Sequence, residues 1–380
     1  MLTLVLGVTL AGCHGPAQRY RNSAPYLERH IRASDDTNFT VMFKATVLVP
    51  SRDILLLDPL WRTLCGGEAW NAMGDGVDDS SFCTNRAPDE LTPQRVALGA
   101  CIELPPQPPV RVLKIKRSAT GPGFLGEDAS GRKFLFKLDH PDSPELSTSA
   151  TIIASRLLWA LGYNVSAEYL VRIEGTGDER FDGHRATASL LVPNVRGHFH
   201  FDWFRHRREL RGLRLAAAWI HDVDRVGSNT LVTVADGRAQ YYLIDFNSCL
   251  GAWQGRPKEP WRGWRPQWSV GWTLLRVCSL GLLHPEPNSR QPVVSPAIGR
   301  FDAVSFDPLA WCPQVPNNAF EHMTRADQRW MARKIAALRR EHIEAIVAAA
   351  EFSDPQDAAT MIDTLLARQQ KIRALGDEWP

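Results

Sequence analysis

The stretch from Leu215 to Gly251 constrains the fold more strongly than any other part of the chain, because apolar elements and polar loops alternate in it in a fixed order. That order is the end of an apolar helix (215–220), a polar loop (221–229), a strand (230–234), an Asp-Gly turn (236–237) and a second strand (240–244). Asp-Gly between two apolar runs is typical of a hairpin. The sequence therefore predicts a helix, a loop and a hairpin, with Asp245 emerging where the second strand ends.

The polar loop and the hairpin carry three residues whose side chains suit phosphoryl transfer. Asp224 and Asn229 lie five residues apart in the loop, and Asp245 follows the second strand. An enzyme of this kind mainly positions groups and neutralises charge, so it needs one Asp to orient the acceptor hydroxyl and further oxygen ligands to hold magnesium. The spacing predicts Asp224 as the catalytic residue and Asn229 with Asp245 as metal ligands. The competing interpretation is a chance grouping of surface side chains.

An earlier block of the sequence has the alternation of antiparallel strands. The predicted strands are 110–116, 124–127 and 133–138, separated by a glycine-containing turn (118–123) and a second turn (128–131). Because side chains alternate along a strand, Phe134, Phe136 and Leu138 share one face, and Lys137 points to the other. A Lys on a strand beneath a glycine loop is how kinases hold nucleotide phosphates. A Lys that snorkels from a half-exposed strand is the alternative.

A helix is expected after these strands. Ser143 and Pro144 supply an N-cap and a first-turn proline, and an apolar stripe then runs to Gly162. Glu145, in the first turn, is the one carboxylate of this helix that could pair with Lys137. Two further strands are predicted at 169–173 and 187–192.

The two motifs at 224–229 and 244–251, DRVGSN and IDFNSCLG, resemble the catalytic and metal-binding loops of phosphoinositide-3-kinase-like enzymes. That group includes bacterial toxin-type kinases and spore-coat kinases, and protein kinases share the arrangement. The resemblance covers roughly residues 110–350 and implies an ATP- and magnesium-dependent kinase. The roles it implies are catalysis for Asp224, metal ligation for Asn229 and Asp245, phosphate binding for Lys137, a phosphate loop at Gly121 and Gly123, and nucleotide-site support from Glu145. The chain departs from the family in two places: Asn247 stands where a Gly is usual, and the helix carboxylate is displaced or missing.

The implied fold class is α+β, a two-lobed protein-kinase-like fold. The predicted organisation is a lipoprotein-type signal (1–13), an irregular cap with a Pro-rich linker (14–109), a strand-rich N-lobe (110–200) and a mainly helical C-lobe (201–380). The prolines between 104 and 109 exclude a helix or central strand there. In the C-lobe, Thr324 with Asp327 predicts a capping box, followed by one helix to Ala350 and another from Asp354.

The N-terminus resembles a bacterial lipoprotein signal. Leu2 to Leu10 is apolar, and Leu-Ala-Gly then precedes Cys13, the residue that would be lipidated after cleavage. This predicts a cell-envelope protein attached to the membrane through Cys13. The alternatives are a buried N-terminal segment or a wrongly assigned start, and with them a cytoplasmic protein.

The charge balance and cysteine content limit the classes of partner that the protein is expected to bind. Lys and Arg number 44 against 42 Asp and Glu, so a dedicated nucleic-acid-binding protein is not expected. The expected partners are a nucleotide and an unidentified phosphate acceptor. Six cysteines besides Cys13 suit an oxidising compartment, with the pairing open, and no CxxC pair suggests zinc. We interpret His198, His200 and His206 as packing and surface residues, because no cysteine or acidic cluster completes a zinc site.

Two functions remain after the sequence is read. One is an ATP- and magnesium-dependent phosphotransferase, and the other is an envelope-anchored scaffold or binding protein that keeps an inactive kinase-like fold. The envelope has no evident ATP supply, so the lipoprotein motif and the kinase motif point in opposite directions.

Overall fold

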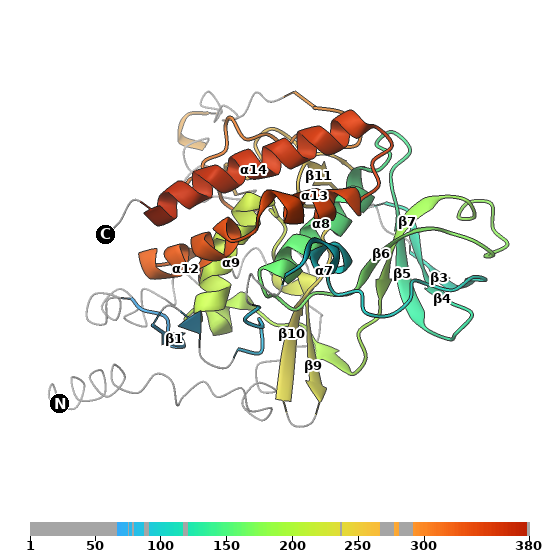
Figure 1. Ribbon diagram of the computed structural model, residues 1–380, viewed down its shortest axis with the longest axis horizontal. Helices are drawn as coiled ribbons and strands as arrows, with labels where there is room; N and C mark the ends of the chain where they lie inside the picture. Colours follow the sequence, from blue (N-terminus) through green and yellow to red (C-terminus); the bar gives the residue numbers. More distant parts are fainter. Residues whose placement is uncertain are drawn as a thin grey trace, which may run out of the picture.

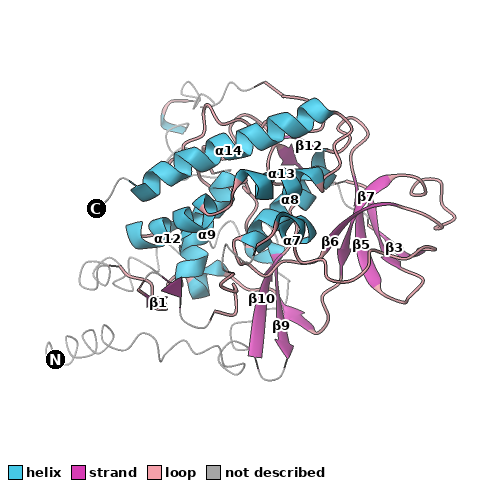
Figure 2. Ribbon diagram, viewed as in Figure 1, coloured by secondary structure: helices cyan, strands magenta, loops and turns pink. Residues whose placement is uncertain are grey.

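A five-stranded antiparallel sheet lies beside a region built mainly of helices, so the chain is a mixed α/β protein (Figures 1 and 2). The structure is a computed structural model, and it describes residues 67–74, 76–77, 80–86, 91–116, 121–235, 238–266, 277–280 and 292–377. The predicted signal at 1–13 and the Asp-Gly turn at 236–237 lie outside the described residues.

The sheet follows the predicted strands closely. It consists of β3 (Arg111–Ile115), β4 (Gly123–Glu127), β5 (Lys133–Leu138), β6 (Glu168–Arg172) and β7 (Arg185–Leu190), in the order β3-β4-β5-β7-β6. The predicted alternation in β5 is confirmed, because Phe134 and Phe136 are fully buried in an apolar cluster with Phe124 and Tyr169. Lys137 lies on the opposite face, paired in register with Gly123 and Thr187.

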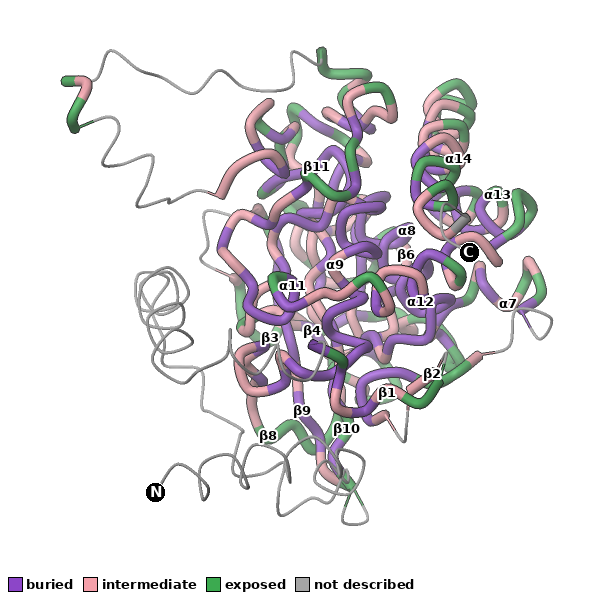
Figure 3. The backbone as a smooth tube through the Cα atoms, turned by 90° about the vertical axis from the view of Figure 1, so that its left-hand side faces the viewer, coloured by how far each residue is buried: buried purple, intermediate pink, exposed green. Residues whose placement is uncertain are grey.

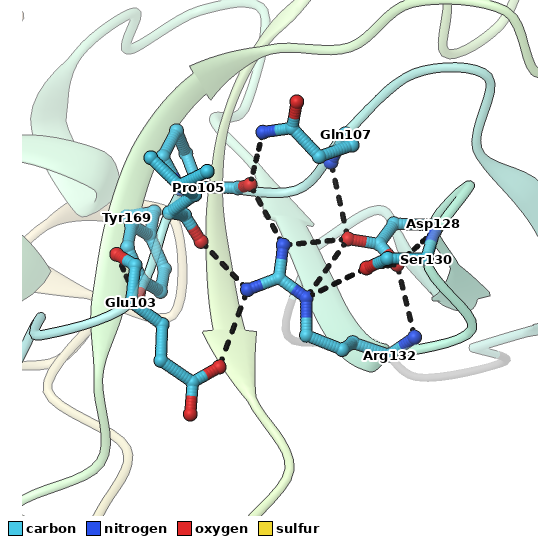
Figure 4. A network of polar contacts seen from close by, with 8 residues as sticks. Glu103, Pro105, Gln107, Asp128, Ser130, Arg132 and Tyr169 are labelled. Atoms are coloured by element: carbon cyan, nitrogen blue, oxygen red, sulfur yellow. Dashed lines mark hydrogen bonds and ion pairs between the residues drawn. The ribbon is translucent and has the colours of Figure 1, made fainter.

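The Pro-rich segment lies outside helix and strand, as predicted, and is fastened to the β4–β5 turn (Figure 4). The Arg132 guanidinium donates to the Leu104 and Pro105 carbonyls at 2.8 and 3.0 Å and pairs with Asp128 at 2.8 Å. Burial opposes ionisation of Asp128, but hydrogen bonds from Ser130 and from the backbone outweigh it and lower its pKa to about 2. A charged, fully bonded carboxylate therefore anchors the segment to the sheet.

Within its described residues, the region predicted as an irregular cap contains a helix that the sequence analysis did not predict. It is α7 (Pro93–Leu98), which begins with an N-cap at Thr92 and a proline in its first turn. α7 packs against α8 (Leu146–Ala160) and α13 (Arg340–Ala348), so it belongs to the main core and not to a separate cap.

All fifteen residues of α8 are buried, which is the pattern of a helix enclosed on every side. Its start differs from the prediction. The N-cap position is Glu145, with a left-handed φ of 66°, and not Ser143. The Asp139 carboxylate supplies the cap, because it accepts hydrogen bonds from the backbone amides of Ser147 and Thr148 at 2.8 and 2.9 Å.

The helical region holds the larger hydrophobic core (Figure 3). Its other helices are α9 (Arg208–Trp219), α11 (Asn318–Glu321), α12 (Arg325–Ala336) and α14 (Pro355–Asp377). The capping box of Thr324 and Asp327 is confirmed. The prediction of a single helix to Ala350 is wrong, because the helix is interrupted between α12 and α13. The His342 side chain accepts a hydrogen bond from the Arg339 amide and so caps the start of α13.

A second antiparallel sheet carries the predicted hairpin. It consists of β8 (Val195–Gly197), β9 (Thr230–Ala235) and β10 (Arg238–Leu243), with Thr230 opposite Leu243. Ile244 and then Asp245 follow β10, and the Ile244 amide donates a hydrogen bond to the Asn229 carbonyl of the polar loop at 3.1 Å. The shorter elements are β1 (Ala72–Met73), β2 (Gly76–Val77), β11 (Ala252–Trp253), β12 (Arg256–Pro257) and the 3₁₀ turns η3 (Phe201–Phe204) and η4 (Gly227–Asn229).

Candidate active site

A buried arginine organises the polar loop between α9 and β9. The Arg225 Nη1 donates to the carbonyls of Asn229 and Ile244, both at 2.8 Å, and its Nε donates to Asp222 at 2.7 Å. Two of the predicted site positions are therefore tied to one guanidinium, Asn229 directly and Asp245 through the residue before it. The neighbouring carboxylate of Asp222 balances the buried charge.

The loop also closes on itself. The Asn229 Nδ2 donates to the backbone carbonyl of Asp224 at 2.7 Å. With the amide NH₂ held by the loop, the Oδ1 atom of Asn229 is the end of the side chain that could contact a cation.

Asp245 meets a lysine from the other sheet. The Lys137 Nζ lies 2.8 Å from the Asp245 Oδ1, although the two residues are 108 positions apart in the sequence. Burial would raise the Asp245 pKa, but the Lys137 ammonium outweighs it and lowers the pKa below its ordinary value. Asp245 also has a left-handed φ of 59°, a strained conformation for a residue with a side chain and one that is common at functional sites.

Asp224 behaves in the opposite way. Burial, followed by the negative charges of Asp222 and Asp245, raises its pKa to about 7. A carboxylate with a pKa near neutrality is suited to accept a proton from a hydroxyl group. The site therefore contains one carboxylate that stays ionised and one that can exchange a proton.

A pocket with an empty volume of about 290 Å³ opens beside Lys137. Two cationic side chains, Lys116 and Lys137, line it, as do Gly121 and Asn247. Burial and then the charge of Lys137 lower the Lys116 pKa. A negatively charged ligand is therefore favoured in this pocket, because it would offset the repulsion between the two lysines.

The two predicted loop glycines have different surroundings. Gly121 lines the pocket and has a φ of 117°. Gly123 is a strand residue in β4, where a Cβ would lie 2.4 Å from the Phe136 carbonyl oxygen. Strand packing alone therefore requires glycine at 123. Residues 117–120 of the predicted glycine turn lie outside the described residues.

The expected pairing of Glu145 with Lys137 is wrong. Glu145 precedes α8, and its carboxylate accepts hydrogen bonds from the Ser353 amide at 3.0 Å and from the Ser353 hydroxyl. The start of α8 thus faces the loop before α14, while Lys137 pairs with Asp245. Glu145 consequently has a structural role between two helices.

A second carboxylate near Lys137 was missed in the sequence. Glu168, which is buried, accepts hydrogen bonds from the hydroxyls of Ser166 and Ser189, both at 2.6 Å. Burial raises its pKa, and it interacts electrostatically with Lys137 and Asp245. The predicted strand began one residue later, at 169. Extending its alternation back by one position would have placed Glu168 on the Lys137 face.

The three histidines of the 198–206 segment have ordinary partners. The His198 ring contacts the Thr230 carbonyl at 2.5 Å, His200 packs against Trp203, and His206 stacks on Trp70. Within the described residues, no three His, Cys, Asp or Glu side chains are grouped as a metal site.

The five cysteines of the described part, Cys83, Cys101, Cys249, Cys278 and Cys312, carry free thiols. No helix in that part is long and apolar enough to cross a membrane.

Comparison with known proteins gives weak structural similarity. No protein-family model matches the sequence, and no curated protein matches it. Among solved structures, the chain is similar to the crystal structure of a Helicobacter pylori proinflammatory kinase, CtkA, at 12% sequence identity and a TM-score of 0.42. The alignment covers 70% of this chain and 97% of the kinase.

Proposed function

We propose that the protein is an ATP- and magnesium-dependent phosphotransferase with a two-lobed, kinase-like fold, as the resemblance to phosphoinositide-3-kinase-like enzymes implies. The observation that carries the proposal is the meeting of Lys137 with Asp245 at 2.8 Å, across 108 residues of sequence. The loop of Asp224 and Asn229 is joined to the same point through Arg225. In this proposal the five-stranded sheet belongs to the N-lobe and the α9–α14 region to the C-lobe.

The nucleotide would enter the pocket lined by Lys116, Lys137 and Gly121. Phosphate oxygens would compete with Asp245 for the Lys137 ammonium, so the ion pair opens when the phosphates bind. Asp245 and the Oδ1 of Asn229 then provide oxygen ligands suited to magnesium. A bound magnesium ion would neutralise charge on the phosphates.

Asp224 would orient the acceptor hydroxyl and accept its proton. Its pKa of about 7 leaves Asp224 partly ionised at neutral pH. The ionised form can accept the hydroxyl proton, and the protonated form can release it again. Asn229 steadies it, because its amide is bonded to the Asp224 backbone.

The second candidate function is a binding or scaffold protein with an inactive kinase-like fold, anchored to the cell envelope through Cys13. One feature of the pocket favours it. Asn247, at the position where the related enzymes usually have Gly, lines the pocket and has a side chain bonded to the Ser248 hydroxyl. A side chain there leaves less space for phosphates and metal.

Calorimetric titration of the full chain with ATP and magnesium tests the proposal. Lys137→Met should reduce the affinity for the nucleotide by about tenfold or more, because a charge-assisted bond to phosphate is lost. Lys133→Met is the matched control, since Lys133 is an exposed residue of the same strand. Equal affinities for the parent and Lys137→Met would contradict the proposal.

A further inference from the structure

The pocket beside Lys137 has a part of its lining that the proposed function does not use. Lys116, Gly121 and Lys137 belong to β5 or to the segment between β3 and β4. The other part is the start of α8, a helix that packs against β5, β6 and β7 (Figure 1). The residues that α8 contributes to the pocket all carry a hydroxyl group, and they are Ser147, Thr148 and Thr151.

Two of these hydroxyl groups have partners within the protein. The Thr148 Oγ1 donates to the Asp139 carboxylate at 2.6 Å, and the Thr151 Oγ1 donates to the Ser147 carbonyl at 2.8 Å. The Arg185 guanidinium donates to the Thr148 Oγ1 at 3.0 Å, and its positive charge opposes the negative charge of Asp139. Thr148 and Thr151 therefore stabilise the start of α8.

Ser147 differs from both threonines. The residue is 7% exposed, and its Oγ is shielded from solvent and has no hydrogen-bond partner within the described residues. Both backbone groups of Ser147 are bonded, because the amide donates to Asp139 at 2.8 Å and the carbonyl accepts from Thr151. The helix start thus fixes the position of Ser147 and leaves its hydroxyl group unpaired.

An unpaired hydroxyl group in the interior is unfavourable for folding, and most buried polar groups are hydrogen-bonded. Alanine at position 147 would avoid this cost, and it has a higher helix propensity than serine. The stability of α8 therefore gives no reason for a hydroxyl group at this position, whereas a ligand in the pocket would supply its missing partner.

We propose that the Ser147 hydroxyl group donates a hydrogen bond to a phosphate group bound in this pocket, which makes Ser147 a ligand-binding residue. The inference rests on the proposed function, because it places the phosphates of the nucleotide in the same pocket. A phosphate group has several acceptor oxygens, so one oxygen can contact Lys137 while another accepts from Ser147. Asp139 occupies the backbone amides of Ser147 and Thr148, so α8 offers the phosphate a side-chain donor and not its free amides.

Calorimetric titration of the full chain with two probes, ATP and inorganic tripolyphosphate, each with magnesium, tests the proposal. Ser147→Ala should raise the dissociation constant of both probes about tenfold or more, because a hydrogen bond to a charged group is lost. Ser155→Ala is the matched control and should leave both constants unchanged. Ser155 is a buried serine of the same helix that does not line the pocket, and its hydroxyl group donates to the Ile152 carbonyl at 3.1 Å.

Thermal unfolding of Ser147→Ala without ligand separates binding from a structural role. The melting temperature should equal or exceed that of the parent, because the substitution removes a buried hydroxyl group that has no partner. A lower melting temperature together with unchanged dissociation constants would show that the hydroxyl group serves the fold, and it would overturn the assignment.

The two probes distinguish failure of this inference from failure of the proposed function. Equal ATP affinities of the parent and Ser147→Ala would overturn the role of Ser147 and leave the phosphotransferase proposal intact. Tripolyphosphate that binds in a Ser147-dependent way, without any binding of ATP, would support the role of Ser147 and contradict the proposed function. Absence of binding by both probes would contradict both proposals.

Discussion

The Lys137 ammonium lies 2.8 Å from the Asp245 carboxylate, which joins the centre of the five-stranded sheet to the end of the β9–β10 hairpin. Each residue is fixed by its own surroundings. Lys137 is held by the register of β4, β5 and β7, and Asp245 follows the Ile244 carbonyl that Arg225 binds. The ion pair therefore forms where the five-stranded sheet and the end of the β9–β10 hairpin come together.

Asp245→Asn should weaken nucleotide binding specifically in the presence of magnesium. The substitution removes the charge that a metal ligand needs but keeps the size of the side chain. Calorimetric titration with ATP, with and without magnesium, measures the effect. A loss of affinity that is the same with and without magnesium would show that Asp245 acts only as the partner of Lys137.

Arg225→Gln should reduce the free energy of unfolding by about 3 kcal/mol or more, because it leaves Asp222 buried without its partner and releases two carbonyls. Urea denaturation measures the change. Arg180→Gln, which alters an exposed arginine, is the control and should change stability by less than about 0.5 kcal/mol. Similar effects of the two substitutions would contradict a central role of Arg225.

The raised pKa of Asp224 makes stability depend on pH. Its pKa rises from 3.8 in the unfolded chain to about 7 in the folded protein, so ionisation costs more in the folded state. Its contribution to stability is complete below about pH 4 and is lost as the pH rises through about 7. Asp224→Asn should therefore stabilise the protein relative to the parent at pH 8, by on the order of a few kcal/mol, and much less at pH 4. Denaturation curves at both pH values test this, and an equal difference at both would refute it.

Cys13→Ser tests the envelope assignment, which rests on sequence alone. If Cys13 is lipidated, the variant should accumulate as precursor in the soluble fraction, whereas the parent should sediment with membranes. An unchanged distribution would remove the lipoprotein interpretation and favour the cytoplasmic alternative.

Local patterns predicted much of the fold. The bounds of β5, its alternation, the capping box at Thr324 and the helix after Asp354 all depend on residues close in sequence. The errors arose where a single side chain, and not the periodic pattern, sets the start of a helix. Asp139 caps α8 from outside the helix, and His342 bonds the Arg339 amide at the start of α13, within what sequence periodicity predicts as one continuous helix.

The residues of the candidate site could be predicted from the sequence, but their partners could not. The spacing of Asp224, Asn229 and Asp245 indicated phosphoryl transfer, but the partners of these residues could not be derived from spacing. Arg225 is inside the predicted motif, yet only the folded chain shows that it binds both Asn229 and Ile244. The surroundings of Glu168 depend on a register that places it opposite Ser189, which is 21 positions later in the sequence.

The measurement that tests the central claim most directly is transfer of the γ-phosphate of ATP by the parent and by Asp224→Asn, with magnesium-ATP binding measured on the same samples. The parent should transfer phosphate to an acceptor or to itself, and the variant should bind equally well while its rate falls about a hundredfold to ten-thousandfold. Binding without turnover in the parent would support the inactive scaffold. If the parent binds no nucleotide, and substitutions at Asp224 and Asp245 change only stability, the kinase assignment is wrong.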